Sequence, residues 1–423
     1  MKRLKRQLST IGLSITMILA MTLSTTALAQ NNEELNHYVA TEEQNLVIQD
    51  RIFLMDDLFE DENFNIYVED LLFAEFSNLF IENLNQARVD NETIMDLFPQ
   101  NRFGEHIYPS FIGGIYYNSD GNLVLQLVEN YIDHYALENS IIETLLGMDI
   151  IIEYVTYSYN YLNKIMDDIG AFAIDFRLPD SVKHIGLDTS GNRINVSIFP
   201  FNEYEKSKFL DEIVSSDSIF FIEQSEEVQN WILPTEDILE DIQRITTARP
   251  GGFLSGGSIG YRARNMSGDG LVTTGHGAFT HNGQVVSGLG TVRGHQRSGN
   301  VDAAFIVTNN NITLSNQIEI TNNTLSTGIV SNFRQGDIFL KVGAATQLTT
   351  GTVVNPNAVF PGLTGQVHTN IFGSQGDSGG IVFSQGPVWQ TAGIVVGGFG
   401  TSGNSLHFTR ANAIQSAFGI SRY

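Results

Sequence analysis

The chain has 423 residues, a formal charge of −24 at pH 7 and no cysteine. Its length allows two to four domains. Without cysteine no disulfide can form, so stability must come from core burial or from a high barrier to unfolding. The acidic excess argues against nucleic acid as a partner, because it would repel phosphates.

Residues 1–29 have the pattern of a secretory signal peptide. A basic head over residues 1–6 precedes a mostly apolar stretch over residues 11–23, and residues 27–29 fit a small-residue cleavage site. The apolar stretch is short and interrupted by Ser and Thr, so a retained membrane anchor is the less favoured alternative. We expect a secreted, extracellular protein with no membrane contact after signal removal, and the absence of cysteine favours a bacterial source.

Composition changes sharply near residue 249. Residues 31–249 hold 11 Lys and Arg against 42 Asp and Glu, whereas residues 250–423 hold 8 against 5, and 31 of the 40 glycines follow residue 249. Such a change predicts two structural units. We call residues 30–249 the acidic region and residues 250–423 the glycine-rich region.

The acidic region is predicted to begin with helices and to continue with two α+β lobes. Residues 31–105 carry apolar groups at helical spacing, which indicates short amphipathic helices or a segment that orders only on contact. The lobes cover about residues 106–175 and 176–235. Each has a predicted hairpin, over residues 114–125 and 186–196, followed by a helix, and the hairpins form a weak internal repeat.

No set of residues in the acidic region stands out as carrying chemistry. Its carboxylates include neighbours such as Asp167 and Asp168, but such groups at helical spacing face solvent far more often than they act as acid and base. Isolated Asp and Asn residues give no convincing calcium loop. We therefore predict no metal site and no cofactor, and we expect this region to serve the one that follows.

The glycine-rich region has the pattern of an all-β domain. Short β-branched or alternating runs are separated by Gly, Asn and Ser turns, which predicts an antiparallel sandwich or barrel. The predicted strands cover residues 258–262, 270–274, 284–289, 303–307, 338–342, 351–354, 381–383 and 392–396. Only residues 410–418 are predicted to be helical.

The segment Gly376–Gly380, with the sequence Gly-Asp-Ser-Gly-Gly, is the most informative motif. Glycines on both sides of Ser378 let the backbone form a tight turn that exposes its hydroxyl. The same turn directs the N–H groups of Gly376 and Ser378 toward one point, where an oxyanion could develop. The alternative is a Gly/Ser loop without chemistry, because a serine hydroxyl is a poor nucleophile without a base.

A base and an orienting carboxylate are available in the same region. His276 ends an apolar strand, and Asp302 is a single carboxylate at the start of another apolar strand. An imidazole can take the serine proton, and a carboxylate on its far nitrogen fixes the tautomer. Singly, His276 would more often be a surface or core residue and Asp302 a turn or capping residue. Together, in the order His, Asp, Ser on an all-β domain, they form a specific pattern.

Residues 251–423 resemble the chymotrypsin-like serine proteases, and most closely the secreted bacterial branch of streptogrisins and α-lytic-type proteases. The segments that carry this resemblance are residues 258–261, 273–276, 301–305, 341–346, 350–353, 376–380 and 393–398. The short interval between His276 and Asp302 suits the bacterial branch. The two hairpin lobes resemble the pro-region of that family.

The resemblance implies a fold of two six-stranded antiparallel β-barrels, preceded by an α+β pro-region, with the active site between the barrels. It implies that His276 is the general base, Asp302 its orienting carboxylate and Ser378 the nucleophile of an endopeptidase. Gly376 and Ser378 would supply the oxyanion-hole N–H groups. It further implies a structural ion pair between Asp377 and Lys341, although Lys341 could instead be an exposed strand lysine.

Three positions depart from the family pattern. Thr274 replaces the usual alanine before Gly-His, and Gly277 replaces the cysteine that usually follows the histidine. Val396 stands where relatives commonly carry a serine that hydrogen-bonds the triad carboxylate. Asp302 must then find other donors or water, which puts full catalytic efficiency in question.

The resemblance also indicates the substrate pocket. Phe372, six residues before Ser378, leaves no acid for a trypsin-like pocket, and Gly397 and Gly398 leave the entrance open. Val396 is the fourth predicted pocket residue. We predict cleavage of protein or peptide substrates after apolar residues.

A double barrel has mostly non-local contacts and folds slowly, which suggests a role for the acidic region. We hypothesise that this region is a folding catalyst and inhibitor in cis, removed by cleavage near residues 246–252 to release a monomeric enzyme. Two other functions stay open: a secreted protease-like β-domain kept for binding, and an acidic surface-interaction protein in which residues 30–249 are the functional part.

Overall fold

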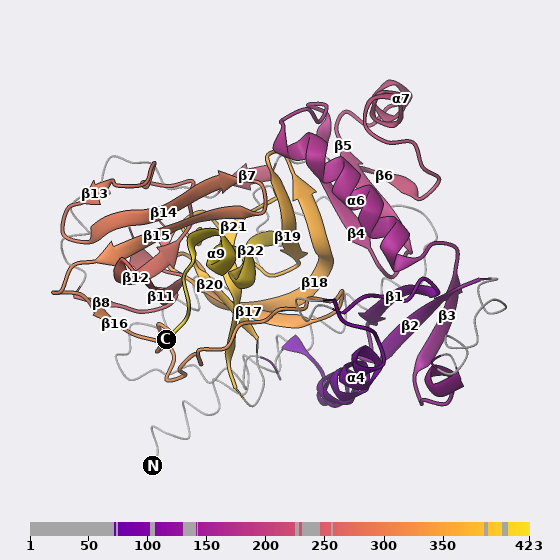
Figure 1. Cartoon of the computed structure of the whole chain (residues 1–423), viewed down its shortest axis with the longest axis horizontal. Coiled ribbons are helices and arrows are strands. Elements are labelled where there is room, and N and C mark those ends of the chain that lie inside the picture. Colours follow the sequence, from indigo (N-terminus) through magenta and orange to yellow (C-terminus); the bar gives the residue numbers. More distant parts are fainter. Residues whose placement is uncertain are drawn as a thin grey trace, which may run out of the picture. The chain divides into compact units, whose positions relative to one another are not determined.

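The structure is a computed structural model. It describes residues 72, 75–101, 106–129, 141, 143–224, 228–230, 246–254, 257–384, 388–399 and 405–423 (Figure 1). Residues 79–423 form one compact unit. The predicted signal peptide lies outside the described residues, as does most of the predicted helical segment, in which α4 (Asn78–Asp96) is described. None of the described helices is long and apolar enough to cross a membrane.

Among its described residues, the acidic region has two sets of three strands with the same topology, of which the second is part of a larger sheet. In each, an antiparallel hairpin is followed by a third strand that lies parallel to the second strand of the hairpin. The strands are β1 (Ile112–Tyr117), β2 (Leu123–Val128) and β3 (Ile151–Val155) in the first sheet, and β4 (Val182–Asp188), β5 (Arg193–Ile198) and β6 (Ile219–Glu223) in the second. The weak sequence repeat therefore corresponds to a repeated hairpin-crossover-strand unit.

Two helices accompany the second sheet. Helix α6 (Tyr159–Ile174) begins at Ser158, whose side chain accepts the N–H of Tyr161, and α7 (Glu203–Glu212) forms the crossover before β6. The apolar groups of α6 recur at the helical period. They pack on β4 and β5, so this helix, which follows the first hairpin in sequence, shares its core with the second hairpin.

The glycine-rich region is built almost entirely of antiparallel strands, as predicted. Strand β8 (Thr247–Ala248) lies just before this region. The described elements of the region are β9 (Phe253–Leu254), β10 (Gly257–Ser258), β11 (Tyr261–Asn265), β12 (Gly268–Thr273), β13 (Val285–Val286), β14 (Gly290–Ser298), β15 (Val301–Thr308), β16 (Thr313–Leu314), β17 (Ile338–Gly343), β18 (Gln347–Phe360), β19 (Leu363–Thr369), β20 (Ile381–Ser384), β21 (Gln390–Phe399), β22 (Leu406–Arg410) and the terminal helix α9 (Ala411–Phe418). Among the strands longer than two residues, β14, β19 and β22 are not among the predicted ones.

Apart from the short pairs β9–β10 and β8–β16, the strands form two sheets, each around its own apolar core. The first sheet has the order β11-β12-β15-β14-β13. The second has the order β17-β20-β21-β22-β19-β18 and closes into a six-stranded barrel, because β17 also pairs with β18. The predicted all-β fold is confirmed, with five strands in the sheet of the first barrel among the described residues.

The sheet of the acidic region continues the sheet of the second barrel. Strand β4 pairs antiparallel with β18 at Ala358↔Gly186 and Val359↔Ile185. In Figure 1 the magenta strands β4 to β6 accordingly extend the orange hairpin β18–β19. Val359 is buried in the core formed by α6, β4 and β5, so the two regions share apolar packing as well as hydrogen bonds.

A second backbone contact joins the two regions. The short strand β7 (Val228–Asn230) pairs antiparallel with β21 at residues 397–399. Residues 228–230 of the acidic region thus lie along the strand that contains Gly397 and Gly398.

Candidate active site

His276, Asp302 and Ser378 are positioned by the ends of strands in both barrels. His276 follows β12, Asp302 is the second residue of β15, and Ser378 lies in the turn before β20. Strands β12 and β15 are paired up to Thr273↔Ala304, which brings the histidine and the aspartate together. All three residues are buried, at 2%, 3% and 1% exposure.

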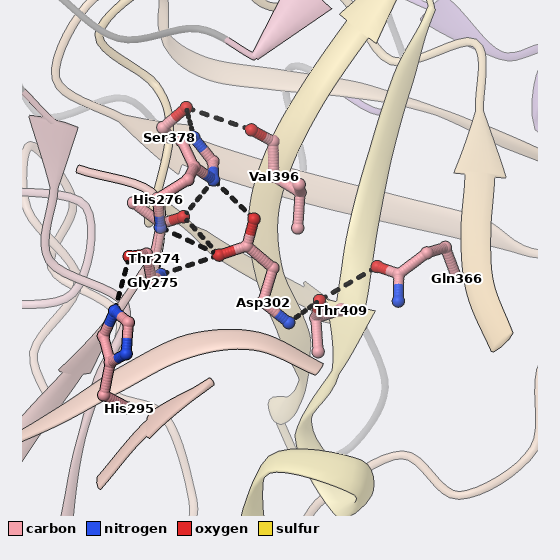
Figure 2. A network of polar contacts seen from close by, with 9 residues as sticks. All are labelled: Thr274, Gly275, His276, His295, Asp302, Gln366, Ser378, Val396 and Thr409. Carbon is pink, nitrogen blue, oxygen red and sulfur yellow. Dashed lines mark hydrogen bonds and ion pairs between the residues drawn. The ribbon is translucent and has the colours of Figure 1, made fainter. Parts of the chain in front are cut away.

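The three side chains form a continuous chain of polar contacts (Figure 2). Nε2 of His276 lies 3.2 Å from Oγ of Ser378, and Nδ1 lies 2.6 Å from Oδ2 of Asp302. With the proton on Nδ1, the imidazole donates to the carboxylate and presents an unprotonated Nε2 to the serine hydroxyl. The sequence-predicted triad residues are therefore brought within hydrogen-bonding distance.

The second oxygen of Asp302 is held by the backbone around the histidine. The N–H groups of Gly275 and His276 donate to Oδ1 at 2.8 and 3.0 Å. Burial by itself would raise the pKa of Asp302, but the charge and hydrogen bond of His276 and the Gly275 N–H together lower it below its usual value. A Cβ on Gly275 would lie 2.3 Å from the carbonyl oxygen of Gln296, so the close approach requires glycine.

The turn that carries Ser378 depends on glycine and on Ser258. Gly376 and Gly379 have φ values of 101° and 86°, in the region that L side chains rarely adopt. The hydroxyl of Ser258 donates to the Gly376 carbonyl at 2.8 Å, and its N–H donates to the Ser378 carbonyl at 2.7 Å. The N–H groups of Gly376 and Ser378 have no acceptor among the described residues, so both are available for an oxyanion.

Lys341 and Asp377 form a buried ion pair beneath this turn. Their side chains are 0% exposed and the Nζ to Oδ2 distance is 2.9 Å, so Lys341 is not an exposed strand lysine. Burial lowers the pKa of Lys341, and Asp377 opposes this shift. Asp377 also accepts the N–H groups of Ala345, Thr346 and Ser374, each at 3.0 Å. These bonds fix the residue next to the candidate nucleophile.

The four residues predicted to form the substrate pocket lie in two segments. Phe372 is half-buried in the loop after β19, where its carbonyl accepts the Thr349 hydroxyl at 2.7 Å. Val396, Gly397 and Gly398 lie in β21. The carbonyl of Val396 accepts the Ser378 hydroxyl at 3.0 Å, which places this strand directly beside the candidate nucleophile.

Three polar side chains around the triad were not identified from the sequence. The hydroxyl of Thr409 accepts the N–H of Asp302 at 3.2 Å, and Nε2 of His295 donates to the Gly275 carbonyl at 2.9 Å. The hydroxyl of Thr274 lies 2.7 Å from Nδ1 of His276. Threonines are common in strands, so a threonine by itself does not indicate an active site. The sequence singled out only Thr274, as a departure from the family pattern.

Three other histidines form a buried cluster where the acidic and glycine-rich regions meet. His368 and His407 face each other on β19 and β22, and His184 of β4 lies with its ring 5.4 Å from that of His368. Phe360 stacks on His407 at 4.0 Å and on His184 at 5.9 Å. We call His184, His368 and His407 the histidine cluster.

Burial keeps the histidine cluster uncharged. It lowers the pKa of His368 to about 4. For His407, burial lowers the pKa to about 3 with the help of His368 and His276, while Asp302 acts in the opposite direction. The pKa of His184 lies well below its usual value, mainly because of burial and secondly because of the two neighbouring imidazoles.

Among the described residues, no group of three His, Asp or Glu side chains is arranged to hold a metal ion. A cavity of about 460 Å³ lies beside Arg249, Glu319 and Gly343. None of its lining residues belongs to the triad or to the predicted substrate pocket.

The sequence matches no family profile and no curated protein. Its structure is similar to those of bacterial serine proteases over part of the chain. The chymotrypsin of Cellulomonas bogoriensis is 25% identical, and protease A of Thermobifida fusca and the Nocardiopsis protease are each 26% identical. Each match covers 42% of this chain and 98% of the other, with a TM-score of 0.36.

Proposed function

We propose that the protein is a secreted serine endopeptidase made as a zymogen. One observation supports the proposal above all. In a buried site, Nε2 of His276 lies 3.2 Å from Oγ of Ser378, and Nδ1 of His276 lies 2.6 Å from Oδ2 of Asp302. Such an arrangement turns a weakly nucleophilic alcohol into a reagent.

The reaction would proceed through an acyl-enzyme. Oγ of Ser378 attacks the carbonyl carbon of the peptide bond while Nε2 of His276 accepts the serine proton. The resulting oxyanion is stabilised by the N–H groups of Gly376 and Ser378. His276 then gives the proton to the departing amine, and the serine ester remains.

The second half repeats these roles with water. His276 takes a proton from the attacking water molecule, the ester bond to Ser378 breaks, and the proton returns to Oγ as the acid product leaves. Asp302 stays ionised throughout, which its lowered pKa supports, and stabilises the imidazolium that forms in each half.

The substrate would lie along β21. An extended peptide can add to a strand edge by backbone hydrogen bonds, and β21 passes beside Ser378 through the Val396 carbonyl. The glycines at 397 and 398 leave room for a side chain, and Phe372 brings no charge to the pocket. Cleavage after apolar residues follows from this composition.

The acidic region would inhibit the enzyme in cis. Its strand β7 pairs with residues 397–399 of β21, and a peptide substrate would need that same edge. Cleavage of the chain and loss of β7 would free the edge.

The acidic region would also act as a folding catalyst. The second barrel contains pairings between strands that are distant in sequence, β17 with β20 and β19 with β22, and such topologies fold slowly. The β4–β5–β6 sheet pairs with β18 and buries Val359, so it can stabilise the β18–β19 hairpin before the barrel closes. This role predicts poor refolding of residues 250–423 alone.

The proposed domain boundary is at residues 249/250, with cleavage just before it. Residues 246–252 are already hydrogen-bonded into the glycine-rich region: the N–H groups of Thr313 and Glu319 donate to the carbonyls of Thr246 and Pro250 at 2.9 and 2.8 Å. Thr246 and Thr247 are exposed. A cut between Thr246 and Thr247 would lose the Thr246 contact. It would keep the Pro250 contact and the bond from the Ser315 N–H to the Ala248 carbonyl, and it would release a monomeric enzyme.

Labelling with a fluorophosphonate probe tests the proposed function. The wild-type chain, expressed with its own leader, should appear in the medium as a shortened and labelled protein. Ser378→Ala should accumulate as an unlabelled, full-length precursor. Ser416→Ala removes an exposed serine of α9 and should behave as wild type. A folded wild-type protein that is neither processed nor labelled would contradict the proposal and favour a binding role.

A further inference from the structure

A hydroxyl group from an unexpected position reaches the triad. Val396 is fully buried and brings no polar side-chain atom to Asp302. Thr274, which directly follows β12, points its hydroxyl at both His276 and Asp302 (Figure 2). The two departures from the family pattern, at Val396 and Thr274, thus both affect the surroundings of the Asp302 carboxylate.

The distances define what the hydroxyl can do. Oγ1 of Thr274 lies 2.7 Å from Nδ1 of His276 and donates to Oδ1 of Asp302 at 3.3 Å. When Nδ1 of His276 carries the proton, this N–H is shared by two acceptors, Oδ2 of Asp302 and Oγ1 of Thr274. The threonine hydroxyl then donates its own proton to Oδ1 of Asp302. The three groups then form a closed ring of hydrogen bonds.

No other side-chain hydroxyl of the described residues is within hydrogen-bonding distance of this carboxylate. The remaining contacts of Asp302 on Oδ1 are backbone N–H groups, and Thr409 contacts its backbone N–H instead. Thr274 is itself only 5% exposed. Its neighbour Thr273 is anchored by a 2.8 Å bond to the Ser258 carbonyl, so the chain is held in place where the hydroxyl is presented.

We propose that Thr274 is a positioning residue that holds His276 in the tautomer and orientation needed by Ser378. This inference rests on the proposed function. A second acceptor on Nδ1 favours the tautomer with the proton on that nitrogen and leaves Nε2 as the base. It also restricts rotation of the ring, which the 3.2 Å contact to Ser378 requires.

Three substitutions separate the hydroxyl from the rest of the side chain. Thr274→Val keeps the shape and removes the hydroxyl, Thr274→Ala removes both the hydroxyl and the methyl group, and Thr274→Ser keeps only the hydroxyl. Each is measured as processed enzyme on a peptide substrate, with active-site titration to count folded sites. Thr369→Val is the control, because it removes a buried hydroxyl bonded to the Leu406 carbonyl at 3.1 Å.

We expect Thr274→Val and Thr274→Ala to lower kcat by about tenfold or more with little change in KM, as for loss of a hydrogen bond to a charged group. Thr274→Ser should recover most of the activity, and Thr369→Val should retain it. Recovery by Thr274→Ser, which restores the hydroxyl without the methyl group, separates the hydrogen bonds from packing.

Equal activity in wild type and Thr274→Val would overturn the inference, as would a loss of activity that Thr274→Ser does not recover, which would indicate packing alone. If Thr274→Val fails to fold, the same comparisons with Thr274→Ala in its place decide the question. A wild-type protein without labelling or cleavage would instead overturn the proposed function, so the two failures are distinguishable.

Discussion

Acid is expected to destabilise the uncleaved chain through the histidine cluster. His184 belongs to the acidic region and His368 and His407 to the second barrel, and all three are buried where β4 continues the barrel sheet. A proton on any of these imidazoles must be accommodated without water. Protonation therefore favours states in which the two regions separate or unfold.

The sign follows from the direction of the pKa shifts. Burial lowers the pKa of His368 to about 4 and that of His407 to about 3, whereas an unfolded chain has the usual value of about 6.5. The stability associated with neutral histidines is complete above pH 6.5 and is lost as the pH falls below it. Between pH 7 and pH 5 the loss is about 2 kcal/mol for each of these two residues, or about 4 kcal/mol together.

Urea unfolding of the Ser378→Ala chain at pH 7 and pH 5 measures this effect without self-cleavage. His368→Gln and His407→Gln should each remove about 2 kcal/mol of the difference between the two pH values. His281→Gln, which removes an exposed histidine, should leave the difference unchanged. A free energy of unfolding that is equal at pH 7 and pH 5, or a difference that neither cluster substitution reduces, would refute the reasoning.

Three further outcomes are expected. Lys341→Met leaves the Asp377 carboxylate buried without its cation and should lower the free energy of unfolding in urea by about 3–5 kcal/mol. Lys164→Met, at an exposed pair, should lower it by almost nothing, and equal effects of the two substitutions would contradict the buried pair. Gly379→Ala would bring a Cβ to 2.3 Å from the Thr273 hydroxyl and should abolish fluorophosphonate labelling, and a fully labelled variant would show that the turn is not constrained. Val359→Asp places a charge in the shared core and should reduce the yield of processed enzyme in expression, and an unchanged yield would remove the support for the folding role.

The sequence could predict the features that depend only on residues close together in the chain. The strand alternation, the Gly376–Gly380 turn and the positions of His276 and Asp302 at strand ends are all visible within a few residues. Strand β14 was missed because charged and polar side chains such as Arg293 and Arg297 interrupt its apolar pattern. A half-exposed strand of this kind is stabilised by its neighbours more than by its own residues.

The features that could not be predicted depend on pairing between distant segments. The histidine cluster exists only because β4 joins β18 and brings His184 beside His368. In the same way, the sequence marked Thr274 as a departure but could not show that its hydroxyl reaches Asp302. Helix α6 follows the first hairpin along the chain, yet tertiary packing assigns its apolar face to the second one.

Mass spectrometry of the inhibited enzyme tests most directly whether the buried hydroxyl is the reacting group. After incubation of the processed protein with a fluorophosphonate, peptide mapping should find one stoichiometric adduct, located on Ser378. An adduct at another residue, or a Ser378→Ala protein that still hydrolyses peptides, would contradict the account.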